Sequence, residues 1–321
     1  MTDTLPLSVA LMPEAPVGDI VELAVLAEQL GLARCWVYDE GLVTRDVYVT
    51  LTAIAGATER LPLGPGITNP FVRHPGATAS AIASLDEFSG ARAFLGLGAG
   101  GGLTLAPMAI ERAKPFTAVS EMVATLRQLF AGDRVTHDGA AFSFAEAHLE
   151  YGRPDIEIIL AGRGPRMTAL GGQSADGFNL GYIHKDLLGG HAAALRDAAG
   201  DRPFRISYST KMVTTDQEFE DARAQLSFRL VDSPPEVREL VGIDDDTVAA
   251  LRAGLAEGGP AHAAQFVDPD WVSSFVLIGS MAECAQELKT LMADNDIDEF
   301  QLPTLEVEHA ADLIERVAAL F

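Results

Sequence analysis

Short apolar segments and longer amphipathic segments alternate along most of the chain. Leu7 to Leu11 has the length and composition of a buried strand, and apolar residues at helical spacing follow it as far as Gly31. The same order recurs at 34–58, 61–89, 92–131 and 156–199. Such alternation is typical of βα units around a parallel sheet. With about eight strands in this order, the sequence predicts a (β/α)8 TIM barrel with insertions, as a single domain over residues 1–321.

Two segments interrupt the alternation. Residues 134–148 have β-type runs on both sides of Asp138-Gly139, which predicts a β-hairpin. Residues 216–275 are rich in helix-forming patterns, and we interpret them as a helical insertion into the barrel. The pattern further predicts one strand over 204–215 and a closing helix over 313–321.

The charge balance and the cysteines limit the classes of function. The chain has 46 acidic and 23 basic residues, a net charge of −23, so it lacks the basic surface that nucleic acid requires. Its two cysteines, Cys35 and Cys284, are far apart and lack metal-ligand spacing, so no metal site is predicted. No basic segment of a signal peptide and no apolar run of membrane-spanning length is present. We therefore expect a cytoplasmic protein with a small-molecule substrate and no nucleic-acid or membrane partner.

Glycine-rich segments follow three of the predicted strands. "GLGAGG" at 96–101 matches a dinucleotide-binding pattern, but the next helix is expected only near residue 114. The alternative interpretations of this segment are a flexible turn at the barrel rim and a place where the backbone approaches a cofactor closely. "LAGRGPRM" at 160–167 is either an anion site at a helix N-terminus or a structural turn. "NLGYIHK" at 179–185 allows the same two interpretations, as a ligand loop or an ordinary turn.

Polar residues also follow the strands. Asp39 ends the second strand, where a carboxylate either meets a ligand at the active face of a barrel or caps the next element. The segment "GPGITNPFVRHPG" at 64–76 combines Pro and Gly with polar side chains after the third strand. His191, His262 and His309 are expected to be solvated helix residues, and no nucleophile motif can be defended from spacing.

Four segments together resemble a known superfamily. They are "GPGITNPFVRHP", "LDEFSGARAFLGLGAGG", "ILAGRGPRM" and "QSADGFNLG", and in this order they resemble the luciferase-like flavin and deazaflavin barrels. The resemblance runs from about residue 5 to 321 and is strongest to the methylenetetrahydromethanopterin reductase group. It implies a (β/α)8 barrel, usually dimeric, that transfers hydride between the deazaflavin coenzyme F420 and a small organic substrate. The alternatives are an FMN-dependent monooxygenase and a catalytically silent flavin-binding barrel.

The resemblance also implies which residues form the site, with a cis peptide bond between Gly66 and Ile67 behind the cofactor ring. The implied cofactor-binding residues are Asp39, Gly66, Ile67, Thr68, Asn69, Gly98, Gly101, Gly102, Leu103, Thr104, Ala161, Gly162, Arg163, Gly164, Gly181, Tyr182 and His184. Many members have His after the acidic residue, whereas Glu40 follows Asp39 here. This departure makes Glu40, Glu14 and His74, beside Asp39, the candidate catalytic residues.

Overall fold

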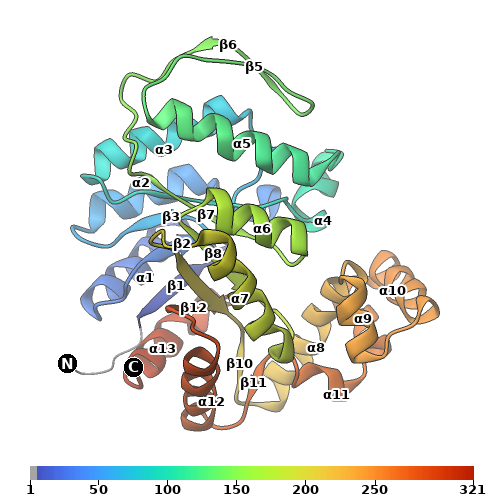
Figure 1. Ribbon diagram of the computed structural model, residues 1–321. Coiled ribbons are helices and arrows are strands. Elements are labelled where there is room, and N and C mark those ends of the chain that lie inside the picture. Colours follow the sequence, from blue (N-terminus) through green and yellow to red (C-terminus); the bar gives the residue numbers. More distant parts are fainter. Residues whose placement is uncertain (1–5) are drawn as a thin grey trace.

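The computed structural model describes residues 6–321 and contains a closed barrel of eight parallel strands (Figure 1). The strands are β1 (Leu7–Leu11), β2 (Cys35–Val37), β3 (Leu63–Pro65), β4 (Phe94–Leu97), β7 (Glu157–Ala161), β8 (Gly177–Gly181), β9 (Arg205–Ser209) and β12 (Glu299–Thr304). Each pairs with its neighbours in chain order, and β12 returns to β1. Bridges between Leu63 and Ala93 and between Thr68 and Leu97 join β3 to β4 and close the ring. The predicted (β/α)8 barrel is confirmed.

Eight helices form the outer layer around the strands (Figure 1). They are α1 (Val17–Gln29), α2 (Val47–Ala57), α3 (Pro75–Ser89), α5 (Pro115–Phe130), α6 (Pro165–Ser174), α7 (Leu188–Ala199), α12 (Met281–Asp294) and α13 (Val307–Ala318). The prediction for the closing helix was wrong in its bounds, since α13 begins six residues before 313. Its buried residues Ala310, Ile314 and Val317 recur at helical spacing, which extends the helix toward its N-terminus.

Large side chains fill the inside of the barrel. Trp36 and Phe94 meet edge to face with ring centroids 4.5 Å apart, and Ala10 and Ile159 complete this cluster. The buried Arg34 lies nearer the strand N-termini, where it pairs with glutamates from β7 and β12. This filling leaves the carboxyl ends of the strands as the end that can admit a ligand.

The hairpin and the helical insertion are both present. β5 (Val135–Asp138) and β6 (Ser143–Ala147) form an antiparallel pair next to α3 and α5 (Figure 1). The insertion consists of α8 (Asp216–Val231), α9 (Pro235–Val241), α10 (Asp245–Ala263) and α11 (Pro269–Val272). It has its own hydrophobic cluster, which contains Leu226, Leu230 and Leu251. No helix among residues 6–321 has the length and hydropathy needed to cross a membrane.

Two further predicted boundaries were wrong. The predicted strand 204–215 is divided into β9 and β10 (Met212–Val213), and β10 pairs with β11 (Leu277–Ile278). The break follows from buried Thr210, whose hydroxyl donates to the Phe275 carbonyl (2.5 Å) and turns the chain toward the insertion. A short helix, α4 (Gly102–Leu105), also begins well before residue 114. The remaining elements are the 3₁₀ turns η1 (Gly41–Val43), η2 (Ala106–Met108), η3 (Lys185–Leu187) and η4 (Ala264–Phe266).

Candidate active site

The segment after β3 is tied to the strands on both sides. The Gly66 N–H donates to the Val37 carbonyl (2.7 Å), and the Thr68 N–H donates to the Gly96 carbonyl (3.0 Å). The peptide bond between Gly66 and Ile67 is cis, at the position that the resemblance implies. A Cβ on Gly66 would lie 2.7 Å from the Trp36 Cβ atom, so only glycine fits there.

Ile67 rests on glycines of β4 and its continuation. A Cβ on Gly98 would lie 2.3 Å from the Ile67 Cδ1 atom, and one on Gly96 would lie 3.2 Å from its Cγ2 atom. Ile67 is only half-buried, although residues on both sides of it are buried. The segment Gly66–Thr68, which we call the bulge, therefore presents the apolar Ile67 side chain at the carboxyl end of the barrel, with Gly96 and Gly98 packed against it.

Two carboxylates follow β2. The Thr68 hydroxyl donates to Asp39 Oδ2 (2.6 Å), and the Thr104 hydroxyl donates to Glu40 Oε2. Burial raises the pKa of the Asp39 carboxyl, with the Thr68 hydrogen bond opposing it. Burial likewise raises the pKa of Glu40 against the Thr104 hydrogen bond. Carboxyls with raised pKa values at a strand end hold a proton to higher pH than exposed carboxyls and are suited to exchange it with a ligand.

The glycines after β4 leave the backbone open. A Cβ on Gly101 or Gly102 would have no atom within 4 Å, and both residues are exposed. Leu103 lies beside them in α4, followed by buried Thr104. This stretch can approach a ligand closely along its main chain.

The Asn69 side chain makes hydrogen bonds within the loop that follows β3. It is buried, and its Oδ1 atom accepts from the backbone N–H groups of Phe71 (3.0 Å) and Val72 (3.1 Å). Gly100, at φ +70°, packs against it. Asn69 therefore fixes the turn that follows the bulge.

The loops after β7 and β8 meet the insertion. Arg163 donates through Nη1 to the Arg229 carbonyl of α8 (3.2 Å). Gly162 packs against Met167, while Gly164, at the N-terminus of α6, faces open space. The loop after β7 therefore exposes backbone at the N-terminus of α6 and also contacts α8.

His184 is buried at the start of η3. Its Nδ1 atom accepts from the Asp186 N–H (3.3 Å), and its ring meets Phe275 edge to face at 5.2 Å. Burial lowers the pKa of His184, so the ring is neutral at physiological pH. Gly181 precedes it at the end of β8, with Asn179 Oδ1 3.2 Å from the position of an added Cβ.

Sequence reasoning missed two residues at the mouth of the barrel. Arg229 lies over the Tyr182 ring, with its guanidinium carbon 3.4 Å from the ring centroid. Tyr38 lies close enough to Arg229 and Glu40 for their charges to act on its pKa, which burial raises. The available signal was helical spacing, since Arg229 is seven residues after buried Ala222 and shares its face of α8.

The candidate proton donors His74 and Glu14 have different surroundings from Asp39 and Glu40. His74 caps α3, where its Nδ1 accepts from the Gly76 N–H (3.1 Å), and its Nε2 lies 3.2 Å from the Ser143 carbonyl oxygen of β6. Glu14 is exposed after β1. Of the four candidates, the structure brings Asp39 and Glu40 together with site threonines, and it engages His74 in anchoring the hairpin.

The prediction that His191 is solvated was wrong. The ring is half-buried between α7 and α6, with Nδ1 3.4 Å from the Thr168 hydroxyl oxygen, and burial lowers its pKa. The physical reason is packing, because α7 and α6 lie against each other along this face. His262 and His309 are exposed, as expected.

A closed barrel with this β3 bulge defines a class, and the chain belongs to the luciferase-like monooxygenase family, whose model matches residues 4–297. It is 33% identical over 293 residues to the 5,10-methylenetetrahydromethanopterin reductase of Methanolobus tindarius, covering 88% of this chain and 90% of that protein. Its identity to the enzyme of the same name from Archaeoglobus fulgidus is 31%, over 88% and 89% of the two chains.

Solved structures agree on the fold. The coenzyme F420 dependent tetrahydromethanopterin reductase of Methanopyrus kandleri superposes with a TM-score of 0.82 at 24% identity, covering 98% of this chain and 97% of that one. An F420-dependent secondary alcohol dehydrogenase, solved with an F420-acetone adduct, gives a TM-score of 0.75 at 18% identity over 99% of both chains.

Proposed function

We propose that this chain is an oxidoreductase that transfers hydride between coenzyme F420 and a small organic substrate. The observation that carries this proposal is the 33% identity, over 88% of the chain, to a methylenetetrahydromethanopterin reductase. The bulge at Gly66–Ile67 supports it, because a half-buried apolar side chain held at a barrel mouth fits one face of a flat ring.

The residues present fit the cofactor in three parts. Ile67 would support the ring, and Asp39 and Thr68 would bind its edge. The phosphate-bearing tail would be held by Gly101–Thr104, Ala161–Gly164 and Gly181–His184, where the main chain is open at Gly101, Gly102 and Gly164. When bound, coenzyme F420 supplies the hydride chemistry. The protein's part is to orient the reactants and to exclude water from the covered face.

Glu40 is the residue that we assign to proton transfer. Addition of hydride to a neutral group leaves negative charge that a nearby acid must neutralise. Burial raises the pKa of Glu40, and the Thr104 hydroxyl fixes one of its oxygens. Glu40 therefore keeps a proton at higher pH than an exposed glutamate and can deliver it from the end of β2.

The test of this function uses the purified protein. Titration with F420 and with FMN, followed by fluorescence, should give binding of F420 and none of FMN. Reduced F420 should then be oxidised with methylenetetrahydromethanopterin as the first substrate assayed. Preference for FMN with oxygen consumption would favour a monooxygenase, and binding without turnover of a substrate panel would favour a silent barrel.

We further propose that the protein is a homodimer. Leu42, Val43, Val49 and Phe88, on η1, α2 and α3, have exposed fractions of 74%, 52%, 61% and 60%. Large apolar side chains gathered on adjacent elements are typical of interfaces between subunits. Light scattering after size exclusion should give a dimer mass, and Val49→Asp with Phe88→Asp should give a monomer. A wild-type monomer at micromolar concentration would refute this assignment.

A cytoplasmic location is also part of the proposal. Cys35 and Cys284 are both free and buried, which is compatible with a reducing compartment. Fractionation of the source cells, with immunodetection of the protein, tests the location directly.

A further inference from the structure

Two arginines lie together at the barrel mouth without an acidic partner. Arg163 follows β7, Arg229 belongs to α8, and the first donates to the backbone carbonyl of the second. Within residues 6–321, neither guanidinium pairs with a carboxylate, although the chain has twice as many acidic as basic residues. In such a protein, a cation without a carboxylate partner needs a specific reason.

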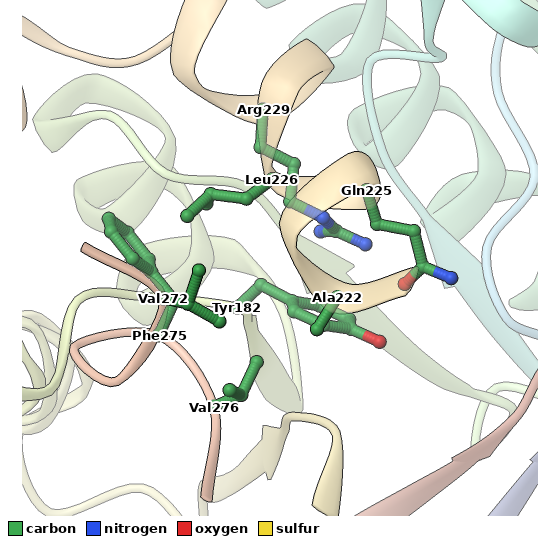
Figure 2. Close-up of a pocket in the computed structure, with 8 residues that line it drawn as sticks. All are labelled: Tyr182, Ala222, Gln225, Leu226, Arg229, Val272, Phe275 and Val276. Atoms are coloured by element: carbon green, nitrogen blue, oxygen red, sulfur yellow. The ribbon is translucent and has the colours of Figure 1, made fainter. Parts of the chain in front are cut away.

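Arg229 is held in place but keeps hydrogen-bonding capacity. Its guanidinium lies over the Tyr182 ring, and its Nε atom is shielded from solvent with no partner. Gln225 Oε1 and the Tyr182 hydroxyl are also shielded and unpartnered. Figure 2 shows Arg229 and Gln225 extending from α8 toward the Tyr182 ring, in a pocket whose other walls are apolar.

This arrangement is unfavourable until a ligand is added. Burial, together with the smaller effect of the Arg229 charge, lowers the pKa of Arg163 to about 10. Burial also lowers the pKa of Arg229. Shielded, unpartnered donors and two adjacent like charges both cost free energy. An anion bound by Arg229 would give the shielded donor a partner and would offset the like charge of Arg163.

We propose that Arg229 recognises an anionic group, a carboxylate or a phosphate, on the substrate. This inference rests on the proposed function. Arg229 comes from the insertion and lies close enough to Tyr38 and Glu40, which follow β2, for their charges to act on its pKa. Arg163 instead lies on the loop assigned to the cofactor tail, so Arg229 is the arginine available to the substrate.

The net charge of the chain makes Arg229 important for substrate selection as well as for binding. At a net charge of −23, the protein repels anions, so an anionic substrate requires a local group of donors. A neutral analogue would leave Arg229 unpaired in the pocket. Arg229 is therefore a specificity-determining residue that favours anionic substrates over neutral analogues.

The experiment compares Arg229→Gln with Arg252→Gln, an exposed arginine of α10 that lies outside the pocket, as a matched loss of one charge. With methylenetetrahydromethanopterin, R229Q should raise KM by about 10- to 100-fold and leave the F420 dissociation constant within about threefold. Inorganic phosphate should inhibit the wild type and R252Q competitively with substrate, but not R229Q. Thermal unfolding, followed by circular dichroism, checks that both variants are folded, and Arg229→Lys should restore part of the affinity.

Three results would overturn the inference. An unchanged KM with unchanged phosphate inhibition would show that Arg229 contacts no anion. A raised F420 dissociation constant with normal KM would assign the anion to the cofactor tail. If the wild type neither binds F420 nor turns over, the proposed function fails. Calorimetry with inorganic phosphate then tests the anion site by itself. Binding to the wild type but not to R229Q would support the site, and no binding to the wild type would refute it.

Discussion

Glu40 is a residue where burial and a hydrogen bond act on the pKa in opposite directions, and burial prevails. As an acid that donates its proton, it should support turnover at low pH and lose this capacity as the pH rises through its raised pKa. Glu40→Gln should lower kcat by about 10²- to 10³-fold and abolish that pH dependence. The measurement is the pH profile of kcat for both proteins. A normal rate and profile in E40Q would remove Glu40 from the mechanism.

The same raised pKa predicts the effect on stability. Because folded Glu40 holds its proton more tightly than the unfolded chain does, its contribution to stability falls as pH rises from the unfolded to the folded pKa. E40Q carries no charge, so above this range it should unfold at a temperature equal to or higher than that of the wild type. Calorimetric scans from pH 5 to pH 8, about one unit apart, test the sign of this difference.

Gly98 tests the support beneath the bulge. In Gly98→Ala, the new Cβ would start 2.3 Å from the Ile67 Cδ1 atom, so Ile67 must move. We expect a loss of about 1–3 kcal/mol in unfolding free energy together with weaker F420 binding. Gly190→Ala in α7 is the matched control, because its Cβ meets nothing within 4 Å and should stabilise slightly. Equal effects of the two variants in denaturant and cofactor titrations would show that Ile67 needs no such support.

For single residues, prediction from the sequence works better where the backbone requires a particular residue type. It works less well where tertiary packing brings distant residues together. Gly66 and Ile67 belong to one contiguous motif, so their position could be recognised. Arg229 and Tyr182 are 47 positions apart, and only the seating of α8 on the barrel makes them neighbours. His74 shows the converse, since a site-like motif contains a residue that the structure uses to cap a helix.

Among the elements, α1 is joined to the segment before β3 by one carboxylate. Glu28 Oε1 accepts from the backbone N–H groups of Glu59 (2.9 Å), Arg60 (2.7 Å) and Leu61 (2.9 Å). Burial opposes ionisation, but these bonds outweigh it and lower the pKa of Glu28. Its stabilising contribution is therefore present above the unfolded pKa and is lost as pH falls through the folded one.

Glu28→Ala should remove this connection and destabilise the protein by about 2 kcal/mol near neutral pH, because three N–H groups lose a charged acceptor. The difference from the wild type should shrink below about pH 4. Glu22→Ala, at an exposed site on the same helix, is the control. Denaturant unfolding at pH 7 and at low pH measures both; an equal loss at the two pH values would contradict the assigned role.

The long elements could be predicted because they carry their own periodic pattern. Strand β10 and its partner β11 could not, since each has two residues and their pairing depends on Thr210 bonding to Phe275 far along the chain. Short α4 was missed for a related reason, because four residues starting with glycine show no helical period.

For the whole molecule, the net charge of −23 predicts a dependence on salt. Repulsion among exposed carboxylates disfavours the compact state, and salt screens it as the Debye length falls from about 10 Å at 0.1 M to about 3 Å at 1 M. The midpoint of thermal unfolding should rise by several degrees over this range. Potassium chloride and choline chloride should act alike if screening is the cause. A falling midpoint would show that the repulsion is minor.

The ring of strands is not equally strong around its circumference. The pairs β8–β9 and β1–β12 each have five residues in register, whereas isolated bridges join β3 to β4. This seam runs directly under Ile67, between Thr68 and Leu97. A flat molecule bound on Ile67 would contact both β3 and β4 and would stabilise the pairing between them. Backbone amides of Thr68 and Gly98 should then exchange with deuterium sooner than those of β8, and become slower once the mouth is filled.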